Sequence, residues 1–304
     1  MAAPTAGIKQ LLKEITSMSS PKPLIVVPLH VSGIWVPYYA ENPLEAGSIG
    51  AGLNLSLYLN ATFQLGPCSI VLNGESLFSE QAEKICKSAG VNIKTTATAP
   101  LTLGRGFGVS AAILIAHSIA THIATSRPLL RALQAAHVLE VEYGTGLGDV
   151  IAEYTGGFAI RLKPGAPGIG FAYRIILRER VDLVVIELGE LEPTKAMLSR
   201  MKPEDYGLGK VLLEKVIENE DLKTFFECSK RFTSKLFNYT RVGSIVDGLP
   251  GIVDYYLKKS ALVVWIEREY AWDILEELRR RGIKALHATI SSIGVSIAHS
   301  TKSP

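Results

Sequence analysis

A glycine-rich segment in the middle of the chain has the composition of a phosphate-binding loop. Its residues are Gly104, Arg105, Gly106, Phe107, Gly108, Val109, Ser110 and Ala111, and alanine and aliphatic residues dominate from there to position 124. Alternating glycines let backbone N–H groups converge on one point, because no Cβ atom stands in the way. The run 109–124 predicts a buried helix, whose free amides and positive dipole end suit a phosphate. The hydroxyl of Ser110 can cap this helix, contact a phosphate or ligate magnesium.

The segment matches neither of two well-defined nucleotide-binding loops. No Gly-Lys-Ser/Thr ends it, as in a Walker loop, and its glycine spacing differs from that of the dinucleotide fingerprint. A glycine loop before a helix can also serve tight packing alone, and the sequence leaves that interpretation open.

A second group of reactive side chains follows at positions 137 to 149. The predicted helix 128–143 places His137 and Glu140 three residues apart, on one face. A loop with three glycines then leads to Asp149, and permissive backbone beside an acid is typical of a position that substrate approaches closely. One carboxylate can accept a proton from a hydroxyl while another holds magnesium. Two alternatives stay open: Asp149 caps the segment 150–154, and His137 is a hydrogen-bonded core residue.

Arg161 lies close in sequence to Asp149, at the end of a predicted strand 158–162. Its planar guanidinium group can hold a substrate carboxylate through two hydrogen bonds. An arginine at a strand edge is usually solvated, so the residue alone leaves both interpretations open.

The overall composition excludes several classes of protein. The 304 residues carry a formal net charge of only +3, and the one basic cluster, Arg279 to Arg281, ends an amphipathic stretch where cations complement a helix C-terminus. We therefore expect no nucleic-acid partner. Cys68, Cys86 and Cys228 are far apart and form no C-x-x-C pair, so we expect neither a disulfide framework nor a zinc site. Sparse cysteines, the lack of a signal pattern and the lack of an 18-residue apolar run predict a cytoplasmic protein with no membrane partner.

The elements that must position these residues alternate without the strict rhythm of a doubly wound sheet, which favours an α+β fold in two domains. Strands are predicted at 24–28, 48–59, 61–65, 69–72, 91–97, 158–162, 172–177, 182–188, 260–266 and 295–298. Helices are predicted at 7–18, 79–89, 109–124, 128–143, 208–235 (as two) and 271–281. The loop 163–170, rich in glycine and proline, is the expected boundary. We thus expect an N-terminal extension (1–20), a first domain (21–170) and a second domain (171–304).

In this order the segments resemble the GHMP kinase family of small-molecule phosphotransferases. Pro100 and the run Gly106 to Ala112 match the family's second motif, with Phe107 and Val109 as substitutions. The family has a glutamate that binds magnesium, an aspartate that acts as a base and a pair of glycines. The matching positions here are Glu140, Asp149 and Gly156-Gly157. Within the family, the segments 145–150 and 156–168 are most similar to the archaeal pantoate kinases. The resemblance extends over about residues 24 to 170.

This resemblance implies a mixed-sheet, ATP-binding first domain and a smaller second domain of the α/β-plait (ferredoxin-like) type. It implies Mg²⁺ between Ser110 and Glu140, and Asp149 as the base that orients or deprotonates the primary hydroxyl of pantoate. The implied ATP-binding residues are Gly104, Gly106, Phe107, Gly108, Val109, Ser110 and Ala111. Arg161, Ser32 and His137 are the implied substrate contacts, and a homodimer is expected. The first motif departs from the family pattern, because His30 and Ser32 stand where a basic and an acidic residue are usual. Two alternatives remain: a related kinase acting on homoserine, mevalonate or shikimate, and a non-catalytic nucleotide-binding protein.

Overall fold

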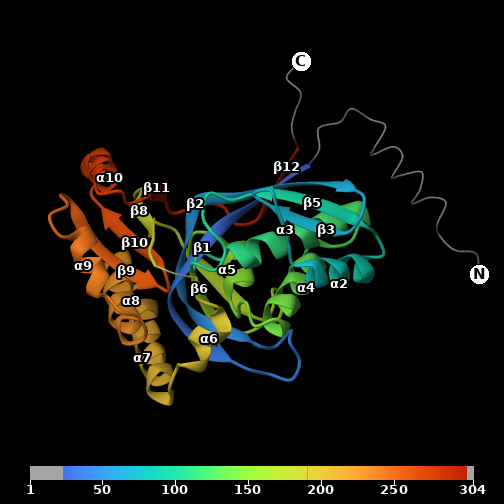
Figure 1. Ribbon diagram of the computed structural model, residues 1–304. Helices are drawn as coiled ribbons and strands as arrows, with labels where there is room; N and C mark the ends of the chain where they lie inside the picture. The colour runs from blue at the N-terminus through green and yellow to red at the C-terminus, as the bar shows by residue number, and fades with distance from the viewer. Residues whose placement is uncertain (1–22, 190, 300–304) are drawn as a thin grey trace, which may run out of the picture.

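Two β-sheets organise the chain, which the computed structural model describes over residues 23–189 and 191–299 (Figure 1). The strands of the first sheet are β1 (Pro23–Tyr38), β2 (Gly47–Leu65), β3 (Ser69–Leu72), β4 (Glu75–Leu77), β5 (Ile93–Thr98), β6 (Phe158–Lys163), β7 (Phe171–Ile175) and β12 (Ser296–His299). Their order is β12-β1-β2-β5-β3-β4, with β6 paired to β2 and β7 to β6. All pairs are antiparallel except β3 with β5, so this sheet is mixed, as expected.

The helices of the first domain are α2 (Ser79–Ala89), α3 (Val109–Ala124), α4 (Leu129–Glu142) and α5 (Asp149–Thr155). Nearly every residue of α3 is buried, because alanine and aliphatic residues cover all its faces, which is typical of a core helix. The helices predicted at 79–89 and 109–124 are confirmed. Pro128, in extended conformation, precedes α4 without a side-chain cap. The helix expected at 7–18 and the extension 1–20 lie outside the described residues.

The second sheet and its helices form the expected α/β plait. Its strands are β8 (Asp182–Glu187), β9 (Ile252–Lys258), β10 (Ala261–Ile266) and β11 (Ala285–Thr289), in the antiparallel order β11-β8-β10-β9. The helices are α6 (Thr194–Ser199), α7 (Pro203–Asn219), α8 (Leu222–Leu236), α9 (Thr240–Val246), η1 (Arg268–Tyr270) and α10 (Ala271–Arg280). The two-domain α+β architecture is therefore confirmed. None of the described helices combines the length and the apolar composition that a membrane span requires.

The hydrogen bonding of the sheets bears on the boundary between the domains. β7 pairs with β6, and β12 returns from the end of the chain to pair with β1, so both strands belong to the first sheet. The predicted boundary at 170 assigns them to the second domain. We therefore propose a boundary after β7, with the chain end returning to the first domain.

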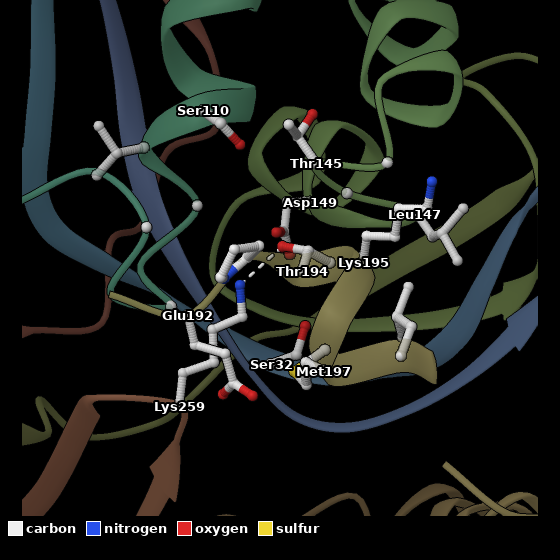
Figure 2. A pocket seen from close by; sticks show the side chains of 18 of the residues that line it. Ser32, Ser110, Thr145, Leu147, Asp149, Glu192, Thr194, Lys195, Met197 and Lys259 are labelled. Carbon is white, nitrogen blue, oxygen red and sulfur yellow. Dashed lines mark hydrogen bonds between the residues drawn. The ribbon is translucent and has the colours of Figure 1, made fainter. Parts of the chain in front are cut away.

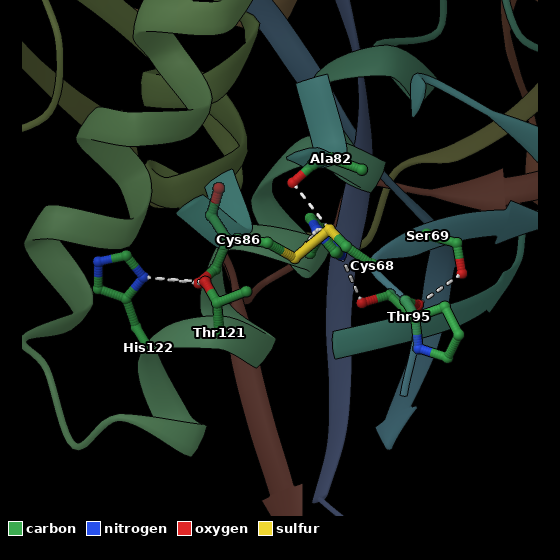
Figure 3. Close-up of a disulfide and its surroundings, with 10 residues drawn as sticks. Cys68, Ser69, Ala82, Cys86, Thr95, Thr121 and His122 are labelled. Atoms are coloured by element: carbon green, nitrogen blue, oxygen red, sulfur yellow. Dashed lines mark hydrogen bonds between the residues drawn. A yellow bond between two sulfur atoms is a disulfide. The ribbon is translucent and has the colours of Figure 1, made fainter. Parts of the chain in front are cut away.

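The structure corrects the expectation for the cysteines. Cys68, the residue before β3, and Cys86 of α2 form a disulfide (Figure 3). Cys228 is free and buried. The pair is 18 positions apart and carries no spacing signature, and it meets only because α2 packs back beside β3. The cysteine pattern therefore no longer argues for a reducing compartment.

We expect the Cys68–Cys86 disulfide to stabilise the fold by about 3 kcal/mol, the value for closing a loop of this length in the unfolded chain. Urea unfolding of the wild type should shift to lower denaturant when a dithiol reductant is added. The double variant Cys68→Ser/Cys86→Ser should unfold at the midpoint of the reduced wild type and ignore the reductant. An unfolding midpoint of the wild type that reductant leaves unchanged would contradict this expectation.

Candidate active site

A cavity of about 410 Å³ lies where the glycine-rich loop, the loop before α5 and the turn between β9 and β10 meet. Six of the seven residues predicted to bind ATP line it: Gly104, Gly106, Phe107, Gly108, Val109 and Ser110. Ala111 is fully buried in α3, one residue further on. Ser32, Thr145 and Asp149 line the cavity as well, and Figure 2 shows Ser110, Thr145 and Asp149 around one space. The structure thus brings together segments that are far apart in sequence.

The backbone of the glycine-rich loop requires its glycines. Gly106 has φ +108°, and a Cβ atom there would lie 2.5 Å from the carbonyl oxygen of Lys258. Gly108 has φ +70° and is the N-cap of α3, where a Cβ atom would overlap the carboxylate of Glu153. These close contacts are a packing reason for glycine at both positions. A separate observation points to an anion: no side chain caps the N-terminus of α3, which therefore presents free amides and its positive end at the cavity wall.

Asp149 is the first residue of α5, and its carboxylate faces the cavity (Figure 2). The alternative that it caps the helix is not supported, because Gly148 is the N-cap and no side-chain cap bond forms. Asp149 Oδ1 lies 3.6 Å from Lys258 Nζ. Burial alone would raise the pKa of Asp149, but the charges of Lys258 and Arg161 outweigh it and hold that pKa below its ordinary value. At neutral pH the site therefore contains an ionised carboxylate.

Glu140 lies behind the cavity wall and is 1% exposed. Its Oε1 accepts a hydrogen bond of 2.5 Å from the hydroxyl of Thr145, whereas Oε2 has no partner among the described residues. Burial raises the pKa of Glu140 to about 7, against the opposing effect of the neighbouring Thr145 and Ser110 hydroxyls. An unpartnered carboxylate oxygen beside two hydroxyls is a set of hard oxygen donors, which fits Mg²⁺.

Arg161 belongs to a buried network below the cavity and does not line it directly. Its guanidinium donates to Ser32 Oγ at 3.3 Å and to His30 Nε2 at 3.2 Å, and it is 1% exposed. Because a guanidinium only donates, His30 Nε2 must be the acceptor. Burial lowers the pKa of His30 to about 3, so this imidazole is neutral. The hydroxyl of Ser32 thus lies between the cavity and the positive charge of Arg161.

His137 does not reach the cavity, which corrects the expectation of a direct substrate contact. It is 1% exposed, and its Nε2 lies 2.9 Å from the carbonyl oxygen of Ala46. Ala46 directly precedes β2, whose Ser48 lines the cavity. Any influence of His137 on a substrate must therefore act through the position of this wall.

Sequence reasoning missed several charged groups at the site. Lys195, Lys258 and Lys259 line the cavity, and all three come from the second half of the chain. Lys259 Nζ donates to Thr194 Oγ1 at 2.7 Å, and burial lowers the pKa of Lys259 to about 8. The only signal in the sequence was a pair of adjacent lysines at the end of an apolar segment.

Glu153 was also missed, because it sits one helical turn after Asp149 in a short segment that gave no signal of its own. Its side chain is fully buried beneath Gly108, and neither carboxylate oxygen has a partner among the described residues. Burial raises the pKa of Glu153 well above its ordinary value, so its carboxyl is held neutral.

No protein-family model matches the chain. Curated proteins similar to it include two pantoate kinases. The pantoate kinase of Thermococcus kodakarensis is 30% identical over 223 residues, which cover 69% of this chain and 74% of that protein. The pantoate kinase of Methanocaldococcus jannaschii is 30% identical over 216 residues, which cover 67% and 77%.

Solved structures show the same fold. A "phosphotransferase related to CoA biosynthesis pathway" superposes with a TM-score of 0.77 at 24% identity, over 91% of this chain and 98% of that chain. The mevalonate diphosphate decarboxylase of Staphylococcus aureus superposes with a TM-score of 0.67 at 13% identity, with the same coverage. A third structure, described as a complex with MVAPP, AMPPCP and magnesium, has a TM-score of 0.66 at 13% identity and covers 93% of this chain and all of that one.

Proposed function

Because the chain belongs to the GHMP kinase family and is similar there to archaeal pantoate kinases, we propose that it transfers the γ-phosphoryl group of ATP to the primary hydroxyl of pantoate. One observation in the structure carries this proposal. An ionised carboxylate, Asp149, shares a cavity with the uncapped N-terminus of α3 and its glycine-rich loop. This arrangement can hold an anionic phosphate chain and a proton acceptor within one small space.

In the proposed reaction the triphosphate lies along Gly104 to Ala111. The hydroxyl oxygen of pantoate forms a bond to the γ-phosphorus while its proton passes to Asp149. The bond from the γ-phosphorus to the bridging oxygen breaks, and its electron pair leaves with ADP. Phosphoryl transfer depends on positioning and charge stabilisation more than on covalent chemistry, so these few groups suffice.

Ser110 and Glu140 are the proposed holders of Mg²⁺. When bound, the ion would neutralise charge on the phosphates and help to position them. The hydrogen bond from Thr145 to Glu140 Oε1 keeps that carboxylate oriented, so that its unpartnered oxygen remains available.

The proposed acceptor side of the cavity is built on Ser32 and Arg161. Ser32 lines the cavity and is held by Arg161 from below, so a carboxylate beside Ser32 would meet a hydroxyl with a guanidinium directly behind it. His137 supports the same wall through Ala46. A carboxylate-bearing alcohol such as pantoate fits this distribution of charge.

The experiment that tests the proposal is a coupled assay of ADP release with four acceptors: pantoate, homoserine, mevalonate and shikimate. We expect the highest kcat/KM with pantoate. A higher value with another acid would assign the chain to a different substrate within the family. ADP binding without turnover of any of them would favour the non-catalytic alternative.

Arg161→Ala should raise the KM for pantoate by about 10- to 100-fold, because it removes the positive charge behind Ser32 together with the hydrogen bond to that hydroxyl, and a hydrogen bond to a charged group contributes about 1.5–3 kcal/mol. The KM for ATP should change by less than about threefold, since the hydrogen bonds of Arg161 in the described part of the chain go to Ser32 and His30. Arg174→Ala is the matched control, because Arg174 lies on the neighbouring strand β7 and its guanidinium donates to the carbonyl of Ser292. Equal increases in both KM values would show that Arg161 supports the whole fold and not the acceptor site.

A further inference from the structure

We propose that Lys258, the last residue of β9, is a catalytic residue whose ammonium group contacts the transferring phosphoryl group while it pairs with Asp149. The proposal rests on the kinase activity proposed above and adds a group that lies outside the sequence motifs. It also gives the second domain a direct part in the chemistry.

The ammonium group of Lys258 is held inside the site. Its side chain is 8% exposed, and its Nζ lies 3.6 Å from Asp149 Oδ1 and 5.9 Å from the ring centroid of Trp35. A separation of 3.6 Å is longer than a direct hydrogen bond. The three N–H donors of this ammonium group are therefore only loosely engaged with Asp149, and Lys258 lines the cavity.

The backbone ties Lys258 to the phosphate-binding loop. Gly106 has no side chain, and this lets the carbonyl of Lys258 pack against it where a Cβ atom would lie at 2.5 Å. The amide of Ser260 donates to the carbonyl of Arg105 at 3.2 Å, and the guanidinium of Arg105 reaches the carbonyl of Leu188 at 3.4 Å. The β9–β10 turn and the glycine-rich loop are thus fixed to each other. The ammonium group of Lys258 therefore has a defined position relative to a bound phosphate.

The distribution of cations around the cavity singles out Lys258. Among the described residues that line the cavity, the lysines and arginines are Lys195, Lys258 and Lys259, and all belong to the second domain. Lys259 Nζ is engaged by Thr194, and Figure 2 shows Lys259 and Lys195 at the rim of the same space. Of the three, Lys258 is the one that forms an ion pair with Asp149. A cation placed beside the base is close to where negative charge moves during transfer.

Lys258 changes no bond of its own in this step. As the bond from the acceptor oxygen to the γ-phosphorus forms and the bond to the bridging oxygen breaks, N–H groups of Lys258 donate to oxygens of the γ-phosphoryl group. The hydroxyl proton goes to Asp149, and the electron pair of the broken bond leaves with ADP. The ammonium group stays protonated and stabilises the charge on the transferring group.

Lys258→Met tests the proposal, because methionine retains most of the length of the side chain and removes its charge. We expect kcat to fall about 100-fold, the lower end of the loss for one preorganised donor. The dissociation constant for ADP, which lacks the γ-phosphoryl group, should stay within about threefold of the wild type. Lys258→Arg should recover at least part of the lost kcat. Lys230→Met is the matched control. Lys230 lies on α8, outside the cavity, and pairs with Asp254 of β9, the strand that ends at Lys258.

The assay uses whichever of the four hydroxy acids the wild type phosphorylates best, so a different substrate overturns the pantoate assignment and leaves this test intact. If Lys258→Met does not fold, Lys258→Gln takes its place, with thermal unfolding as the check. Wild-type kcat in the uncharged variant would overturn the role of Lys258. So would a fall in ADP affinity as large as the fall in kcat, because Lys258 would then be an ordinary nucleotide contact. A wild type that turns over none of the acids overturns both proposals.

Discussion

Asp149→Asn should lower kcat about 1000-fold while the dissociation constant for ADP stays within about threefold of the wild type. Asparagine has nearly the shape of aspartate but cannot accept the hydroxyl proton as a base. Asp149 is positioned for that task, because it faces the cavity from the first residue of α5 and the charges around it keep it ionised. Loss of a negative charge next to the phosphates should not weaken nucleotide binding. Single-turnover kinetics together with ADP titration would measure both quantities.

The matched control for this prediction is Asp273→Asn. Asp273 lies in the first turn of α10, as Asp149 lies in the first turn of α5, but it is exposed and remote from the cavity. Both variants lose the favourable interaction of an acid with a helix N-terminus, which is worth about 0.3–1 kcal/mol. Only Asp149→Asn should lose turnover. Near-normal kcat in that variant would remove Asp149 from the proposed role of base.

The sequence predicted those elements whose local signals agree with their packing. The helix at 109–124 is apolar on every side and begins directly after Gly108, so burial and N-terminus could both be located. The helix at 79–89 ends at Gly90, whose left-handed backbone supplies its C-cap. For β1 only residues 24–28 were predicted, because proline, serine and glycine interrupt the pattern beyond them. The strand continues to Tyr38 because register shifts around Pro28 and Gly33 absorb these interruptions.

The candidate site divides in the same way. The predicted site residues between Gly104 and Asp149 were found because contiguous motifs carry them, and most of these predicted residues line the cavity. Lys258 was not found, because it is more than a hundred positions away and reaches the site only through the pairing of β9 with β10. The burial of Arg161 was likewise not predictable, since strands and helices packed around it decide it, whereas a buried, hydrogen-bonded His137 was one of the interpretations that the sequence left open. The types of the site residues and their order along the chain were thus predictable. Their burial and the contacts between the two domains required the structure.

Glu140→Gln should have the second large effect, a loss of about 1000-fold in kcat/KM at millimolar Mg²⁺. Glutamine can still accept the hydrogen bond of Thr145, but it replaces the unpartnered carboxylate oxygen proposed as a metal ligand. Higher Mg²⁺ concentrations should recover part of the activity. Glu142→Gln is the matched control, because Glu142 lies on the same helix but is exposed and paired with Lys84. An unchanged Mg²⁺ dependence in Glu140→Gln would exclude Glu140 as a ligand.

Glu140→Gln should also stabilise the protein when Mg²⁺ is absent, and this stabilisation should depend on pH. Burial raises the pKa of Glu140 from 4.5 to about 7. Between these values the unfolded chain binds fewer protons at this position than the folded protein, so Glu140 lowers stability progressively as pH rises from about 4.5 to 7. Above pH 7 the cost is complete, at about 3 kcal/mol for this shift. Urea unfolding at pH 8 should therefore show Glu140→Gln to be more stable than the wild type, and at pH 4 the difference should disappear.

Mg²⁺ and protons should compete for Glu140 in the wild type, because only the ionised carboxylate can ligate the metal. The Mg²⁺ concentration for half-maximal activity should be constant above about pH 7 and rise about tenfold for each pH unit below it. Glu140→Gln has no ionisable group there, so its weaker Mg²⁺ dependence should be flat across this range. Asp149 cannot produce the same profile, because its pKa is held below the ordinary range of a carboxyl. A half-maximal Mg²⁺ concentration that is independent of pH in the wild type would show that the metal is held elsewhere.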